Sequence, residues 1–184
     1  MKEMMRYGFV LAIICIIASG LLAGVNSLTK PKIIAQARAE EQSSLKEVLP
    51  QAENFEPVHP YTFAAKGVGV KSAEDIIYYK AYDKNGKFMG AAFKASGKGY
   101  SSTIEVMVGM LDDGTITAIK VLSQNETPGL GANVAEPPFT SQFSHKKNLD
   151  DVQAITGATI SSKAVIDSVR KKAQEIKELI KNER

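Results

Sequence analysis

Cysteine and histidine are scarce in this chain, and their scarcity excludes several kinds of chemistry. The 184 residues include one cysteine, Cys15, and two histidines, His59 and His145. Cys15 lies inside an apolar segment, so disulfides, thiolate catalysis, cysteine zinc sites and iron–sulfur clusters lack ligands. The histidines stand in polar stretches without a second ligand at metal spacing, which favours exposed loop positions. Any redox chemistry therefore requires another cofactor.

A strong excess of charge is also lacking. The formal net charge is +3, from 23 basic and 20 acidic residues, and the lysines are spread among acids instead of forming a stripe. Nucleic acid is therefore not an expected partner. The length, with 44% hydrophobic and 23% charged residues, fits one globular domain plus an appendage and leaves no room for two domains.

Residues 7–25 carry no charge at all. At about 1.5 Å per residue, a helix of this length spans roughly 28 Å, just enough to cross the hydrocarbon core of a bilayer. Lys2 and Arg6 precede it and Lys30 and Lys32 follow it, so the positive-inside rule gives only a slight preference for orientation. The segment predicts a transmembrane anchor.

A cleaved signal peptide is the alternative interpretation of the same segment. Small residues at 18–20 and 23–25 are of the kind that signal peptidases accept. The apolar run is longer than the roughly 7 to 15 residues of a signal peptide, which favours an uncleaved anchor. Both interpretations export the rest of the chain.

Two further helices are predicted outside the anchor. Alanine, glutamate and a short apolar stripe indicate a helix over 33–49 that ends at Pro50. Residues 51–70, with two prolines and no clear period, indicate an extended connection. From Ser162 to Arg184 the chain is predicted to be helical, with Val165, Val169, Ile176 and Ile180 on one stripe.

Between these helices the hydrophobic period changes to two. It predicts a meander of about four strands over 75–82, 88–95, 104–110 and 115–122, with hairpin turns at 83–87 and 112–114. In the last strand, Ile116 and Ala118 fall on one face while Ile119 and Val121 fall on the other. This pattern is typical either of a β-bulge or of a strand buried on both sides.

Residues 123–132 form a loop rich in small residues. Pro128 fixes one φ angle, while Gly129 and Gly131 permit positive φ or close approach by another group. Proline–glycine pairs also mark ordinary connections, so these residues alone favour neither interpretation. On the functional interpretation, a planar ligand reaches the backbone here and Glu126 offers it an acceptor. Residues 137–143 follow as a short amphipathic helix.

The turn Thr156-Gly157-Ala158-Thr159 directly precedes the C-terminal helix, for which Ser161 or Ser162 is the expected N-cap. Backbone N–H groups and the helix dipole favour an anion at this point, and phosphate is one candidate. A helix entry rich in serine and threonine is commonplace, so the residues alone favour a purely structural role.

The turn also resembles the flavinylation motif of the FMN-binding domain family, which reads Asp-x-x-(Ser/Thr)-Gly-Ala-Thr. The last threonine of that motif carries FMN through a phosphoester bond. The resemblance implies that Thr159 is the acceptor here, after Thr156, Gly157 and Ala158. Gln153 occupies the position of the aspartate, and two aspartates lie just upstream, at 150 and 151.

The likeness covers nearly the whole chain and points to one branch of the family, the RnfG subunits of the Rnf electron-transport complexes. It is carried by the anchor, by the stretches 46–50, 97–100, 105–109 and 113–116, and by Glu126-Thr127-Pro128-Gly129-Leu130-Gly131. The NqrC subunit of the sodium-pumping NADH:quinone oxidoreductase is similar in architecture and bound flavin, and is the runner-up. It is usually longer than this chain.

The resemblance implies an α+β protein with an N-terminal transmembrane helix and a twisted antiparallel sheet flanked by helices. It divides the chain into an anchor over 1–30, a linker helix and extended connection over 31–60, and an extracytoplasmic FMN-binding domain over 61–184. It implies FMN held covalently by Thr159. The other residues expected at the cofactor are Thr156, Gly157, Ala158, Ser161, Ser162, Glu126, Thr127, Gly129, Leu130, Gly131, Tyr100 and Lys163.

The implied function is electron transfer within a membrane-bound ferredoxin:NAD oxidoreductase that moves sodium ions or protons. The implied partners are the other membrane and peripheral subunits, the lipid bilayer and, during maturation, a flavin transferase. No catalytic acid, base or metal is required for electron transfer. Two other functions are open: an anchored binding or assembly protein whose threonine turn only caps a helix, and a regulatory FMN-binding domain without a pump.

Overall fold

The computed structural model describes residues 2–59 and 76–182, with side chains from Met5 onward. It divides into two compact units, Met1–Glu41 and Gln42–Arg184. Helix α1 (Lys2–Val48) makes up the first unit as far as Glu41, and its last residues belong to the second unit. The anchor and the helix predicted over 33–49 are thus one continuous helix, which passes through Pro31 at the cost of one backbone hydrogen bond.

The N-terminal part of α1 is long and apolar enough to cross a membrane, and it is the one such helix in the described part of the chain. Its large hydrophobic side chains, from Met5 to Ile34, are exposed. A helix that is apolar all round and has no protein neighbours is suited to lipid. The predicted anchor is therefore present as a helix.

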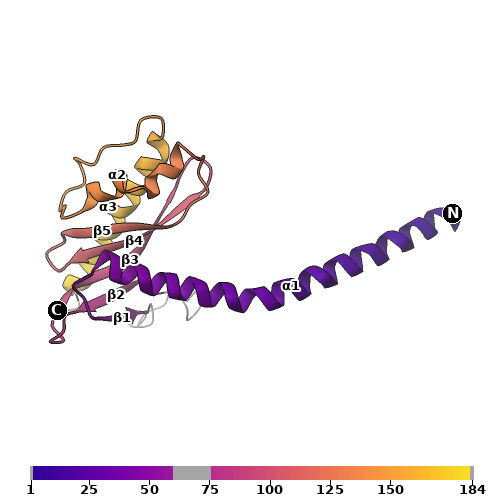
Figure 1. Cartoon of the computed structure of the whole chain (residues 1–184), viewed down its shortest axis with the longest axis horizontal. Coiled ribbons are helices and arrows are strands. Elements are labelled where there is room, and N and C mark those ends of the chain that lie inside the picture. Colours follow the sequence, from indigo (N-terminus) through magenta and orange to yellow (C-terminus); the bar gives the residue numbers. More distant parts are fainter. Residues whose placement is uncertain (1, 60–75, 183–184) are drawn as a thin grey trace. The chain divides into compact units, whose positions relative to one another are not determined.

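The second unit is built on one antiparallel sheet whose five strands follow each other in chain order (Figure 1). The strands are β1 (Asn54–Val58), β2 (Tyr78–Tyr82), β3 (Phe88–Lys98), β4 (Thr103–Leu111) and β5 (Ile116–Ser123). The four strands that the hydrophobic period predicts are confirmed. The fold class, an N-terminal apolar helix followed by an antiparallel sheet with helices, is confirmed as well.

The strand β1 was not predicted, because its sequence lacks alternation and contains Pro57. It lies at the edge of the sheet, where it pairs with β2 alone. A proline is tolerated there because an edge strand leaves one row of its N–H groups without sheet partners. Part of the extended connection predicted over 51–70 is therefore sheet, and residues 60–70 lie outside the described residues.

Helices cover both faces of this sheet (Figure 1). On one face, α3 (Thr159–Asn182) packs its buried residues Val165, Val169 and Ile176 against the largest hydrophobic cluster, with Phe93 and Val108 of the sheet. The apolar stripe predicted for this helix is confirmed. On the other face, Leu45, Val48 and Leu49 pack against a second cluster.

Short helices follow β5 and cover its flank. They are the 3₁₀ helix η2 (Gly131–Ala135), α2 (Pro137–Thr140) and η3 (Ser141–Phe143). Phe139 and Phe143 are buried in an edge-to-face contact with ring centroids 5.4 Å apart. The short amphipathic helix expected at 137–143 is therefore present, in two pieces.

A β-bulge resolves the ambiguity in β5. Ala118 pairs with Gly109, but Ile116 pairs with Met110, so Thr117 is an extra residue in this strand. The extra residue lets Ile116 and Ile119 both join the cluster on the α3 side. The bulge is observed, and the strand also packs on both faces, because Ala118 and Leu122 lie against the second cluster.

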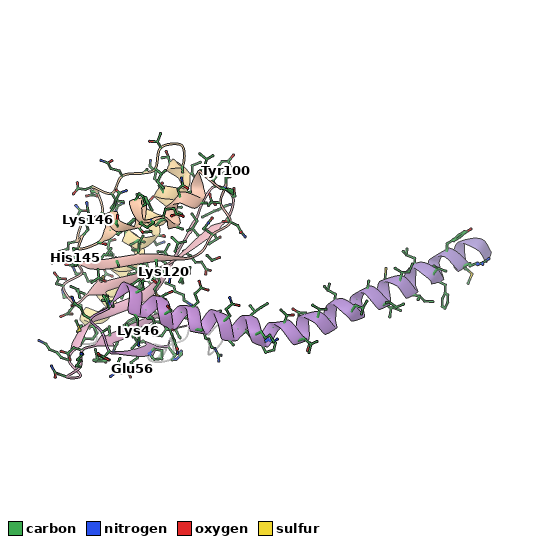
Figure 2. The ribbon with its side chains drawn as sticks, viewed as in Figure 1. Lys46, Glu56, Tyr100, Lys120, His145 and Lys146 are labelled. Carbon is green, nitrogen blue, oxygen red and sulfur yellow. The ribbon has the colours of Figure 1, made fainter. Side chains whose placement is uncertain are left out.

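The bulge also receives the C-terminal end of α1. Thr117 Oγ1 donates a hydrogen bond to the carbonyl oxygen of Val48, one of the last α1 carbonyls, which have no partner within the helix. Lys120, which Figure 2 labels, forms an ion pair with Glu47. A Cβ on Gly109 would overlap the Val48 oxygen, so only glycine leaves room for this approach.

We predict that Gly109→Ala lowers the free energy of unfolding of the full chain by about 1–3 kcal/mol, because the added methyl overpacks the contact between α1 and the sheet. Chemical denaturation in detergent micelles, followed by circular dichroism, measures this. Gly24→Ala is the control, since a Cβ there meets nothing within 4 Å. Equal stability of the two variants would contradict the close approach.

Candidate functional site

A pocket of about 420 Å³ opens at the end of the sheet where β3 turns into β4. Three segments form it: the β3–β4 turn, the loop after β5, and the turn that begins α3. Figure 2 shows Tyr100 at this end of the sheet. The lining residues are Tyr100, Glu126, Thr127, Leu130, Gly131, Gly157, Ala158, Thr159, Ile160 and Ser161.

The buried carboxylate of Glu126 joins these three segments. Its Oε1 accepts hydrogen bonds from the backbone N–H groups of Ser101 (2.9 Å) and Ser102 (2.8 Å) and from Ser102 Oγ (3.3 Å). Its Oε2 accepts from the N–H of Tyr100 (3.1 Å) and from Ser161 Oγ (2.6 Å). Both oxygens are thus occupied by protein donors. The sequence suggested Glu126 as a fixed acceptor for a ligand, and these donors hold its carboxylate in place among the residues that line the pocket.

Two glycines make room for this carboxylate. A Cβ on Gly99 would lie 2.6 Å from Glu126 Oε1, and one on Gly131 would lie 2.7 Å from both Glu126 Oε2 and Ser161 Oγ. The close approach expected at Gly131 is therefore made by side chains of the protein itself. Gly129 has a positive φ of 75° and supplies the turn before it.

Burial and hydrogen bonding act on the Glu126 pKa in opposite directions. Desolvation raises the pKa, but the hydrogen bonds from Ser161 and from the N–H groups of Ser102, Ser101 and Tyr100 together outweigh it and lower the pKa to about 2. The carboxylate is therefore ionised at neutral pH. Glu126 is also the one charged residue among those that line the pocket.

The walls of the pocket expose apolar side chains. Tyr100 is 73% exposed, Leu130 47% and Ile160 57%. Among the described residues of the second unit, these three are the large hydrophobic side chains that are exposed, and all three line this pocket. Exposed apolar groups gathered at one site mark a binding surface, and a flat or apolar ligand suits this one.

Helix α3 begins at Thr159, three residues earlier than predicted. Ser161 and Ser162 therefore lie in its first turn and neither is the N-cap. Ser162 Oγ instead accepts from the N–H of Ile155 (3.0 Å) and donates to the carbonyl oxygen of Ala158 (2.9 Å), which fixes the turn before the helix. Gly157 supports this turn with a positive φ of 81°.

Thr159 lies at an N-terminus suited to an anion. Its side chain is exposed at the pocket. The N–H groups of Thr159, Ile160 and Ser161 have no hydrogen-bond partner among the described residues, and the first turn contains no acidic side chain. These N–H groups therefore present the positive end of the helix dipole to the pocket, while the ionised Glu126 carboxylate lies beside the same turn, bonded to Ser161 Oγ.

Most of the residues expected at a cofactor meet at this pocket, and four do not line it. Ser162 is buried behind the turn, while Thr156, Gly129 and Lys163 are exposed outside the lining. Ile160, Ser101 and Ser102 were missed. The sequence gives no signal for the two serines. It gives none for Ile160 either, since an isoleucine in an amphipathic helix is normally expected in the core.

Two family models match this chain. A family model described as FMN-binding domain matches residues 99–174, which include the whole pocket. A second, described as RnfG N-terminal region, matches residues 1–48, which include the apolar helix. The two models together match both units.

Similar proteins carry one designation. The subunit designated G in the ion-translocating oxidoreductase complex of Methanosarcina acetivorans is 34% identical over 91% of this chain and 92% of its own length. Its counterpart in the Na⁺-translocating ferredoxin:NAD⁺ oxidoreductase complex of Acetobacterium woodii is 31% identical over 98% of this chain and 95% of its own. This chain belongs to the RnfG family.

Membership makes the second unit an FMN-binding domain and the chain a single-pass membrane protein of an electron-transport family. Among solved structures, the subunit designated C of the Na⁺-translocating NADH-quinone reductase from Parabacteroides distasonis is similar, with a TM-score of 0.49 and 19% identity over 76% of this chain and 82% of that chain. The RnfG assignment does not depend on it.

We predict that Glu126→Gln removes a pH-dependent part of the stability. The folded pKa of about 2 lies below the ordinary value of 4.5, so the carboxylate stabilises the fold above pH 4.5 and loses this contribution as the pH falls toward 2. At pH 7 the contribution is about 3 kcal/mol. Urea unfolding at several pH values should show the two proteins converge in acid, and a constant difference would contradict the prediction.

Proposed function

We propose that this chain is the electron-carrying subunit of an ion-translocating Rnf-type ferredoxin:NAD oxidoreductase and holds FMN through a phosphoester bond to Thr159. The observation that carries the proposal is the position of the Thr159 hydroxyl. It is exposed at the pocket, at a helix N-terminus with three N–H groups open to an anion, and beside the exposed side chains of Tyr100 and Ile160.

The residues present fit such a group. FMN combines a flat apolar ring system with a polar chain that ends in phosphate. The pocket combines exposed apolar walls with an anion-favouring helix end, and its volume lies in the usual range for small-molecule sites. A Cβ placed on Gly157 would lie 3.4 Å from Leu130 Cδ2, so glycine keeps this side of the turn open beside Thr159.

Each part of the site has a distinct role in this proposal. Thr159 Oγ1 holds the phosphate covalently and the first N–H groups of α3 stabilise its charge. Tyr100, Leu130 and Ile160 cover the apolar ring and reduce its contact with water. Lys163 follows Thr159 by one helical turn and lies on the same side of α3, where its cation adds to the attraction for phosphate. Bound flavin supplies one- and two-electron redox chemistry.

Attachment requires a partner, because a threonine hydroxyl is not nucleophilic at neutral pH. We propose a flavin transferase that takes the proton from Thr159 Oγ1. The oxygen attacks the phosphorus of a flavin nucleotide that carries a phosphoanhydride. The Oγ1–P bond forms, the anhydride P–O bond breaks, and the remaining nucleotide leaves with the electron pair. Exposure of Thr159 makes the hydroxyl accessible to such an enzyme.

The proposed complex and location follow from the relatives. Those from Acetobacterium woodii and Clostridium ljungdahlii are named as subunits of Na⁺- and proton-translocating ferredoxin:NAD⁺ oxidoreductase complexes. We propose the same assembly here, with the second unit on the extracytoplasmic side. A covalent bond retains the flavin there, where free FMN is too dilute to rebind. The designation that these relatives share favours this assembly over the NADH:quinone oxidoreductase or an isolated binding protein.

We predict that Thr159→Ala abolishes covalent flavin. Wild-type full chain, expressed with a flavin transferase, should gain the mass of one FMN less water in intact-protein mass spectrometry, and the variant should gain none. Thr159→Ser should keep the modification, since it keeps a hydroxyl at the same position. Thr29→Ala is the control, because this exposed threonine lies outside both the motif and the pocket lining. An unmodified wild type, or a modified alanine variant, would reject the assignment.

We also predict that the second unit is labelled from outside the cell. Cys15 is the single cysteine, so Cys15→Ala provides a background for one new thiol at the exposed position Lys181. Lys181→Cys in this background should react with a membrane-impermeant maleimide in intact spheroplasts. A thiol that reacts only after lysis would place the unit in the cytoplasm.

A further inference from the structure

We propose that Glu126 is a positioning residue that sets the two walls of the flavin site against each other before the flavin is attached. The identity of the ligand rests on the proposed function, but the positioning role rests on contacts within the protein. The three segments that form the pocket lie far apart in sequence. Glu126 accepts hydrogen bonds from residues 24 to 26 positions before it and from a residue 35 positions after it.

One oxygen atom links the walls. Glu126 Oε2 accepts from the N–H of Tyr100, on the β3–β4 turn, and from Ser161 Oγ, two residues after Thr159 in α3. The separation of the Tyr100 ring from the Thr159 hydroxyl therefore depends on this shared acceptor. Loss of it removes the hydrogen-bonded link between the turn and the helix, while Tyr100, Leu130 and Ile160 remain in place as the apolar walls.

The same carboxylate fills an anion site that the backbone makes. The N–H groups of Tyr100, Ser101 and Ser102 follow one another and all point at Glu126. Successive N–H groups of this kind form a nest for anions. With the nest filled from within, the N-terminus of α3 is the part of the pocket that is open to phosphate. Glu126 thus also directs the anionic end of the ligand toward Thr159.

Other side chains at position 126 do not reproduce the contacts of the glutamate. A carboxylate has about four lone-pair sites and here receives five donors, so the amide of glutamine cannot replace it, because its NH₂ group would face N–H donors. Aspartate is one methylene shorter. The gap left by alanine, in contrast, has the shape and the donors to accept a free carboxylate such as acetate.

The test uses full-length chain in detergent, matured with the transferase. Peptide-resolved hydrogen exchange reports the amides of residues 100–102, and the fluorescence anisotropy of attached flavin reports its mobility. Glu126→Gln and Glu126→Ala should raise the exchange rates at least about tenfold and lower the anisotropy. Added acetate, but not chloride at equal ionic strength, should reverse both changes in Glu126→Ala.

Two further variants serve as a control and as a test of the link to α3 alone. Asp113→Asn removes another carboxylate that holds a turn, through Thr115 and Lys147, at the opposite end of β4. It should leave exchange at 100–102 and flavin anisotropy unchanged. Ser161→Ala cuts only the link to α3, so it should lower the anisotropy while residues 100–102 stay protected. It also provides the test if the Glu126 variants fail to fold.

The outcomes separate this proposal from the proposed function. One result is that wild type acquires no flavin mass but Glu126→Ala shows fast exchange that acetate reverses. The positioning role of the Glu126 carboxylate is then supported and the flavin assignment fails. If flavin is attached and Ser161→Ala leaves its anisotropy unchanged, the positioning role is overturned. Unchanged exchange in Glu126→Gln, or equal effects in Asp113→Asn, would overturn it as well.

Discussion

A single buried charge organises the functional end of this protein. Removing a carboxylate from water is unfavourable unless hydrogen bonds replace those it loses, and Glu126 recovers them only when the β3–β4 turn and the first turn of α3 are both in place. The full set of hydrogen bonds to this carboxylate therefore forms only when all three segments are in place. Gly99 and Gly131 belong to the same constraint, because any side chain there would occupy the volume of the carboxylate.

The two faces of the sheet have different roles. One face packs against α3, which carries Thr159 at its start, and the other receives the last turns of α1 at the Thr117 bulge. The bulge serves both faces, since it turns Ile116 and Ile119 to the same core and presents the Thr117 hydroxyl to Val48. Among the residues described, the exposed large hydrophobic side chains lie on α1, which suits lipid, and at the pocket, which suits a cofactor.

Under the proposed function the pocket requires no acid, base or metal, because bound flavin supplies the redox chemistry. Among the residues described, no cluster of histidine, cysteine and acidic side chains could hold a metal ion, and the one charged lining residue is fully hydrogen-bonded. In this proposal the chain contributes retention, orientation and shielding of the cofactor. The exposed hydroxyl at the helix N-terminus is assigned the first role, and the apolar walls are assigned the other two.

The sequence by itself determined the elements whose signal is local: the apolar helix, four of the five strands, the stripe of α3 and the threonine turn with its family resemblance. Tertiary structure decided what depends on partners distant in sequence. The edge strand β1 lacks alternation and is fixed by pairing with β2. The choice of a bulge at Thr117 and the start of α3 at Thr159 follow from packing and hydrogen bonds to other segments. Glu126 shows the difference most clearly, because its type and loop suggested an acceptor for a ligand, whereas the donors that occupy it arrive from turns 24 to 35 residues away.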